Sequence, residues 1–123
     1  MLGNAVAFAG VDPPTRLATA LLVVLLVADL KSITPHWIQF LIEPLLGRFD
    51  YVTPLYLRHK YDGTITNNIA YPLTRSLYGR RVRQPIGGDF GFSGELAQYY
   101  LEHETWDEDV AQFGIDIWMT TLA

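Results

Sequence analysis

Cysteine is absent from this 123-residue chain, and charged residues make up only 18% of it. The lack of cysteine excludes a disulfide framework and thiolate metal sites. A net charge of −4 argues against a general nucleic-acid binder, which meets the phosphate backbone with a basic surface. The longest apolar run, Leu17–Val27, is shorter than the roughly 20 residues that a membrane-spanning helix needs.

Half of the residues are hydrophobic, so the chain can bury a core, and its length suits one small domain. The N-terminus has no basic segment ahead of an apolar run, and no targeting signal is evident. We therefore expect a cytoplasmic protein without a stable membrane span. A membrane-associated protein anchored by 17–27 is a minor alternative.

The first third of the chain predicts a strand–helix–strand unit. Leu21–Val27 is a short, continuous Val/Leu run, typical of a strand covered on both faces, and Asp29 follows it. Thr34 and Pro35 suit a helix start, and an apolar stripe continues to Gly47, interrupted by Pro44. A second strand is expected over 49–57. This order predicts an α/β fold with a mostly parallel sheet flanked by helices.

A polar loop follows, over 58–68, rich in hydrogen-bonding side chains. Since it comes after a strand, it can hold a polyhydroxyl or anionic ligand, although a solvated loop has the same composition. A helix is expected over 68–78, with Gly79 ending it.

The most informative stretch is residues 80–93. Three arginines lead into Gln84-Pro85-Ile86-Gly87-Gly88-Asp89, and Ser93 is a candidate N-cap for the next helix. A tight turn with a solvated Asp89 is the alternative interpretation, because Gly-Gly-Asp is common in turns.

The remaining residues predict two helices. The first covers 95–103, with Leu96, Tyr99 and Tyr100 facing inward, and the second begins near Asp116. An acidic patch around Trp106 is interpreted as a solvated face.

Several of these stretches are similar to the sugar-nucleotide-dependent glycosyltransferases that include mannosylglycerate synthase and glucosyl-3-phosphoglycerate synthase. These are family 2-like enzymes with the GT-A (Rossmann-like) fold. The resemblance covers most of residues 21–121, and its most specific part is the run Gln84–Phe90. The other similar stretches are 27–38, 51–56, Arg58 with 62–67, and 113–117.

The resemblance implies retaining transfer of a hexose from a nucleoside diphosphate sugar to a small hydroxylated acceptor such as glycerate. A divalent cation, Mg²⁺ or Mn²⁺, would bridge the two phosphates and neutralise charge on the leaving diphosphate. The family holds the metal with an Asp-x-Asp motif. Asp29 matches the second aspartate, whereas Val27 occupies the position of the first and weakens the expected metal binding.

The remaining site residues follow from the same resemblance. Asp89 is expected near the transferred sugar as the catalytic residue, with Gln84, Gly87 and Gly88 in its supporting loop. Arg58, Gly63 and Thr66 are expected to contact the acceptor. Thr64 replaces the arginine of the phosphoglycerate-using members, which makes a phosphorylated acceptor less favourable.

Two parts of the family pattern have no counterpart in residues 1–123: the opening nucleotide-binding strand and a C-terminal metal-ligating histidine. The resemblance thus implies a single, incomplete glycosyltransferase domain. A half-sheet would expose apolar surface and unpaired edges, so we expect self-association. The alternative to an enzyme is a non-catalytic remnant that binds a ligand weakly or acts as a self-association module.

Overall fold

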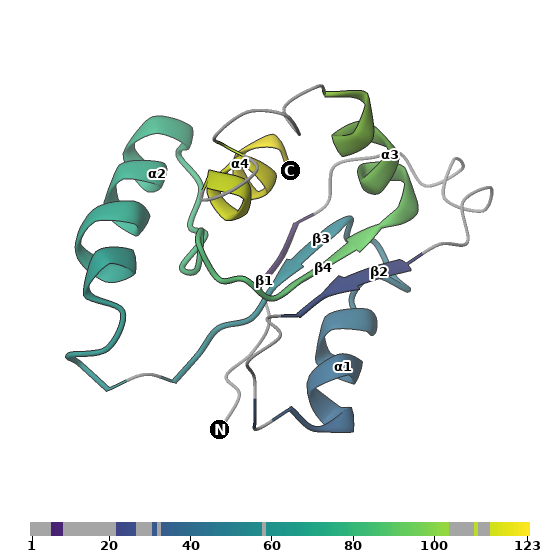
Figure 1. Ribbon diagram of the computed structural model, residues 1–123, viewed down its shortest axis with the longest axis horizontal. Coiled ribbons are helices and arrows are strands. Elements are labelled where there is room, and N and C mark those ends of the chain that lie inside the picture. The colour runs from purple at the N-terminus through teal and green to yellow at the C-terminus, as the bar shows by residue number, and fades with distance from the viewer. Residues whose placement is uncertain are drawn as a thin grey trace.

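The computed structural model describes residues 6–8, 22–26, 31, 33–57, 59–103, 110 and 114–123. They form a small sheet with helix α1 (Pro35–Ile42) on one face and helices α3 (Gly94–Glu102) and α4 (Ile115–Leu122) on the other (Figure 1). The expected combination of helices packed on a sheet, an α/β-like architecture, is confirmed. None of the helices in the described part of the chain is long and apolar enough to cross a membrane.

The four strands lie in the order β1 (Val6–Phe8), β3 (Tyr51–Thr53), β4 (Phe90–Ser93) and β2 (Leu22–Leu25). All three strand pairs are antiparallel. The expectation of a mostly parallel sheet is therefore wrong for the described strands. The strand–helix–strand unit does make β2 and β3 run in the same direction, but β4 lies between them and pairs antiparallel with both.

The sequence analysis predicted neither the short edge strand β1 nor the central strand β4. The short run Phe-Gly-Phe-Ser of β4 follows two glycines and precedes a helix cap, so it resembles a connecting loop. Strand β3 is shorter than the expected 49–57 and ends at Thr53, because Pro54 has no N–H to continue a ladder.

Helix α1 starts as predicted, with Thr34 in an extended conformation and Pro35 in the first turn. It ends at Ile42, before the expected Gly47, and a series of turns follows. Pro44 accounts for the early end, because proline cannot donate the hydrogen bond that another helical turn needs.

The core on the α1 side contains Leu41, Leu45 and Val52. Gly91 of β4 faces this helix. A Cβ atom at Gly91 would lie 2.9 Å from the carbonyl oxygen of Leu41 and 3.1 Å from Cδ1 of Leu45. The glycine therefore allows the helix to approach the middle strand closely.

The core on the opposite face consists mainly of aromatic side chains. Because side chains alternate along a strand, Tyr51, Phe90 and Phe92 point away from α1. They pack with Tyr100 of α3 and Met119 of α4. The Tyr51 and Phe90 rings are stacked with centroids 5.5 Å apart. Two layers of helices therefore enclose the middle of the sheet.

Helix α3 confirms the predicted cap, since the Ser93 hydroxyl accepts a hydrogen bond of 3.2 Å from the N–H of Leu96. Tyr100 is buried as expected. Tyr99 is 44% exposed, so its predicted inward orientation is wrong. Helix α4 begins at Ile115, in agreement with the helix expected near Asp116.

A π-helical turn, η2 (Thr66–Ala70), continues directly into helix α2 (Tyr71–Tyr78). This pair stands at the side of the sheet (Figure 1). It matches the helix predicted over 68–78, and Gly79 ends it in the left-handed conformation, with φ of 67°.

Candidate functional site

Three segments that are separate in the sequence meet at one end of the sheet, where strands begin or finish. Register pairs Leu25 of β2 with Phe90, and Val52 of β3 with Gly91. The C-terminal ends of β2 and β3 therefore flank the N-terminal end of β4. The sequence analysis expected the ligand at this end of the sheet, where β2 and β3 finish. It did not expect an antiparallel strand to begin there.

Asp89, immediately before β4, is the best-supported of the predicted site residues. It is only 2% exposed. The hydroxyl of Tyr56 donates a hydrogen bond to its Oδ2 atom. Asp89 is thus a buried, hydrogen-bonded carboxylate, and the interpretation of a solvated turn residue is wrong.

A second carboxylate, Asp116 in the first turn of α4, lies close enough to Asp89 for their charges to interact. Burial raises the pKa of Asp116, and the neighbouring Asp89 charge raises it further. A hydrogen bond from the backbone N–H of Gly88 acts in the opposite direction. Two carboxylates from distant parts of the chain therefore share one end of the sheet.

The sequence analysis gave Asp116 no role. The signal was present, because Asp116 lies within the Phe-Gly-Ile-Asp-Ile stretch of the resemblance. A lone Asp at the start of a helix is, however, a common feature with an ordinary structural explanation, since helix N-termini favour negative charge.

The glycines of the supporting loop have specific structural roles. Gly88 has φ of 73°, a left-handed conformation that favours glycine. In this conformation its N–H reaches Asp116. At Gly87, a Cβ atom would lie 2.9 Å from Cγ of Gln84. These two glycines let the loop fold tightly around Gln84 and toward Asp116.

Hydrogen bonds from buried hydroxyl groups connect helix α4 to the same loop. The Thr120 hydroxyl donates a 2.9 Å hydrogen bond to the carbonyl of Pro85. It also lies 2.8 Å from the Tyr51 hydroxyl. Because Thr120 has a single hydroxyl hydrogen, Tyr51 must be the donor of this second bond. The position of Asp116 relative to Asp89 is therefore fixed by the sheet core.

A cavity of about 230 Å³ lies beside Tyr56, the hydrogen-bond donor to Asp89. Tyr56 lines the cavity and also donates to Asp89, so the two features are adjacent. The other described residues around it are Leu55, His59, Lys60, Asn67, Arg83 and Gln84. Basic and amide side chains thus dominate its wall.

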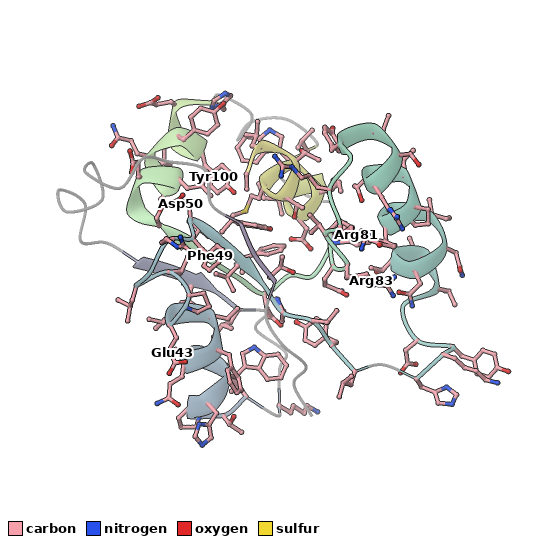
Figure 2. The ribbon with its side chains drawn as sticks, turned by 180° about the vertical axis from the view of Figure 1, so that it is seen from behind. Glu43, Phe49, Asp50, Arg81, Arg83 and Tyr100 are labelled. Carbon is pink, nitrogen blue, oxygen red and sulfur yellow. The ribbon has the colours of Figure 1, made fainter. Side chains whose placement is uncertain are left out.

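Arg83 projects between its own loop and helix α2 (Figure 2). Its guanidinium carbon lies 4.4 Å from the centre of the Tyr71 ring. Hydrogen bonding from Arg83 lowers the pKa of Tyr71, and Arg75 adds to this effect. The aromatic ring thus helps to orient the guanidinium of Arg83, a residue that lines the cavity.

The remaining predicted residues have different outcomes. Asp29, Val27 and Arg58 lie outside the described residues. Gly63 forms a turn with φ of 62°, and Thr66 is buried at the start of η2. Neither residue lines the cavity, whereas the adjacent Asn67 does. A role for Gly63 and Thr66 in acceptor binding stays a prediction.

The described part of the chain contains no group of three or more His, Cys, Asp or Glu side chains placed to hold a metal ion. It does provide two neighbouring carboxylates, Asp89 and Asp116. Mg²⁺ commonly binds one or two protein carboxylates together with substrate phosphates and water. Two carboxylates alone do not make a metal site, although each offers oxygen atoms of the kind that Mg²⁺ binds.

A scan of family models finds none that matches this chain, and searches of curated proteins and of solved structures likewise find no match.

Proposed function

We propose that this chain is a glycosyltransferase domain of GT-A type, transferring a hexose from a nucleoside diphosphate sugar to a small hydroxylated acceptor such as glycerate. The observation that carries the proposal is the pair formed by the buried Asp89 and the half-buried Asp116 at the end of the sheet where β2 and β3 finish.

The two carboxylates have different surroundings, which suits a division of roles. Asp89 accepts a hydrogen bond from Tyr56 and orients the sugar or the acceptor. Asp116, whose raised pKa makes its carboxylate a stronger base, accepts the proton that the acceptor hydroxyl loses as its oxygen bonds to the sugar and the bond from the sugar to the diphosphate breaks. Gly88 keeps Asp116 in place through its backbone N–H.

A divalent cation, when bound, would neutralise the negative charge that develops on the departing diphosphate. By resemblance Asp29 would hold it, and Val27 provides no ligand at the position of the first aspartate. The protein would then depend on the diphosphate oxygens to complete the coordination. Weak donor binding is the expected consequence.

The presence of Val27 specifically favours a second candidate, a non-catalytic relative that retains the fold and binds ligands weakly. Calorimetric titration with UDP and GDP, with and without Mn²⁺, separates the two. Metal-dependent binding supports the transferase. If Val27→Asp leaves this binding unchanged, the match between Asp29 and the metal site is wrong.

Activity is tested by release of UDP or GDP from nucleotide sugars in the presence of glycerate. Asp89→Asn and Asp116→Asn are expected to abolish release, whereas Glu43→Gln should not. Glu43 is exposed at the end of α1, on the other face of the sheet, and provides the same change of charge. Equal loss in all three variants would contradict the assignment.

A further inference from the structure

The cavity beside Asp89 has an unbalanced charge. Its seven described lining residues include Lys60 and Arg83 and no carboxylate. His59 adds an imidazole ring to the wall. A small polar cavity lined in this way attracts negative charge, because its walls focus the field of the cations.

Gln84 provides a second, independent observation. The side chain is 5% exposed and lines the cavity. Its Nε2 atom is buried, and no described residue accepts a hydrogen bond from it. A buried amide without an acceptor is costly, so such an orphan donor beside a cavity points to a ligand that supplies the acceptor.

We propose that this cavity binds a small oxyanion, a carboxylate or a phosphate group, with Arg83, Lys60 and Gln84 as its donors. Arginine and lysine provide charge-assisted hydrogen bonds, and the Gln84 amide provides a neutral one. Binding here does not require sugar transfer, so this site can be tested whether or not the transferase proposal holds.

Two of the three donors are already oriented. Tyr71 holds the guanidinium of Arg83 at 4.4 Å from its ring centre. Gly87 packs against Gln84 so closely that a methyl group would displace it. Preorganised donors lose less conformational freedom on binding, which favours affinity for a small ligand.

The size of the cavity limits its ligand. At about 230 Å³ it lies below the range of roughly 300–1,000 Å³ that is usual for sites of drug-sized molecules. A nucleotide sugar is too large for it. A short hydroxy acid, a phosphate ester or inorganic phosphate fits this description.

The first experiment is a titration of the whole chain, followed by NMR amide shifts at constant ionic strength. The probes are inorganic phosphate, glycerate and, as a neutral match, glycerol. We expect one or both anions to shift residues 59–67 and 83–84, and glycerol to leave them unchanged. The anion that binds more tightly shows whether the site prefers a phosphate or a carboxylate group.

The variants are Arg83→Met, Lys60→Met and Gln84→Met. Each should weaken binding of the preferred anion by about tenfold or more, the loss expected for a hydrogen bond to a charged group. Arg80→Met is the matched control, because Arg80 is exposed three residues away and does not line the cavity. If Arg83→Met does not fold, Lys60→Met provides the same test, because Lys60 is exposed and tolerates substitution more readily.

Two results would overturn the proposal. One is a wild-type spectrum that neither anion changes at residues 59–67 and 83–84. The other is equal weakening in Lys60→Met and Arg80→Met, which would mean that the anions respond only to net charge. Loss of transferase activity with intact anion binding would leave this inference standing.

Discussion

The Tyr56 hydroxyl donates a hydrogen bond to Oδ2 of Asp89, joining the segment that follows β3 to the segment that precedes β4. Asp89 is buried and Tyr56 is partly buried. The Tyr56 ring also packs against the Trp37 ring, with centroids 5.7 Å apart. Tyr56 therefore links the α1 face of the sheet to the candidate site.

Replacing Tyr56 by phenylalanine removes this bond and leaves a buried carboxylate with one partner fewer. We expect Tyr56→Phe to lower the free energy of unfolding by about 1–3 kcal/mol. Urea denaturation measures the change. Tyr61→Phe is the control, because the Tyr61 side chain is exposed and should tolerate the loss of its hydroxyl. An equal effect in both variants would contradict the role of the Tyr56 bond.

The raised pKa of Asp116 predicts a specific dependence of stability on pH. Between the ordinary pKa of an aspartate and the higher pKa in the folded state, the native protein binds more protons than the unfolded chain. Asp116 therefore makes stability fall as pH rises through this window.

Asp116→Asn should remove that contribution while keeping an acceptor for the Gly88 N–H. Relative to wild type, the variant should become more stable as pH rises through the window, and the gain should disappear below the ordinary pKa of aspartate. Thermal unfolding at a series of pH values tests this. A difference between the two proteins that stays constant with pH would show that Asp116 has no raised pKa.

Gly91→Ala is expected to destabilise the fold by about 1–3 kcal/mol, the usual cost of overpacking a core. The added Cβ would lie 2.9 Å from the backbone oxygen of Leu41, which has little freedom to move. Gly47→Ala is the matched control, since its Cβ would meet nothing closer than 3.4 Å. Chemical denaturation of both variants should show a loss only for Gly91→Ala.

Self-association, expected from the sequence, now has a candidate surface. Exposed aliphatic side chains recur every four residues along η2 and α2: Ile65, Ile69, Leu73 and Leu77. Leu73→Glu should shift light scattering toward a monomer, and Leu46→Glu, at a more exposed position after α1, should not. A monodisperse wild-type monomer at micromolar concentration would contradict this prediction.

Local features were predictable from the sequence where a single residue decides the backbone. Pro35, Gly79 and Ser93 mark helix boundaries through a fixed φ, a left-handed cap and a side-chain acceptor. Strand β4 was missed because it depends on two neighbours that are distant in the sequence. The prediction of a parallel sheet was wrong for the same reason. A strand–helix–strand unit indicates that its two strands run in the same direction, but it does not reveal that a third strand lies between them.

The candidate site shows the same division. Asp89 stands in an unusual glycine-rich context, so the sequence alone made it a candidate site residue. Asp116 and Tyr56 gain their significance only from their proximity to Asp89, which the sheet register and the Thr120 hydrogen bonds create. The cavity wall likewise combines residues of two segments, 55–67 and 83–84, that no local pattern connects.

The insertion of β4 between β2 and β3 affects when the candidate site forms during folding. Leu22 pairs with Ser93, and Tyr51 with Phe92, so the sheet is built from contacts between distant parts of the chain. Such contacts form late, because a long loop must close before they can be made. The helices can therefore appear early in refolding, whereas ligand binding should return only in the slowest phase, when Asp89 reaches its place in the finished sheet.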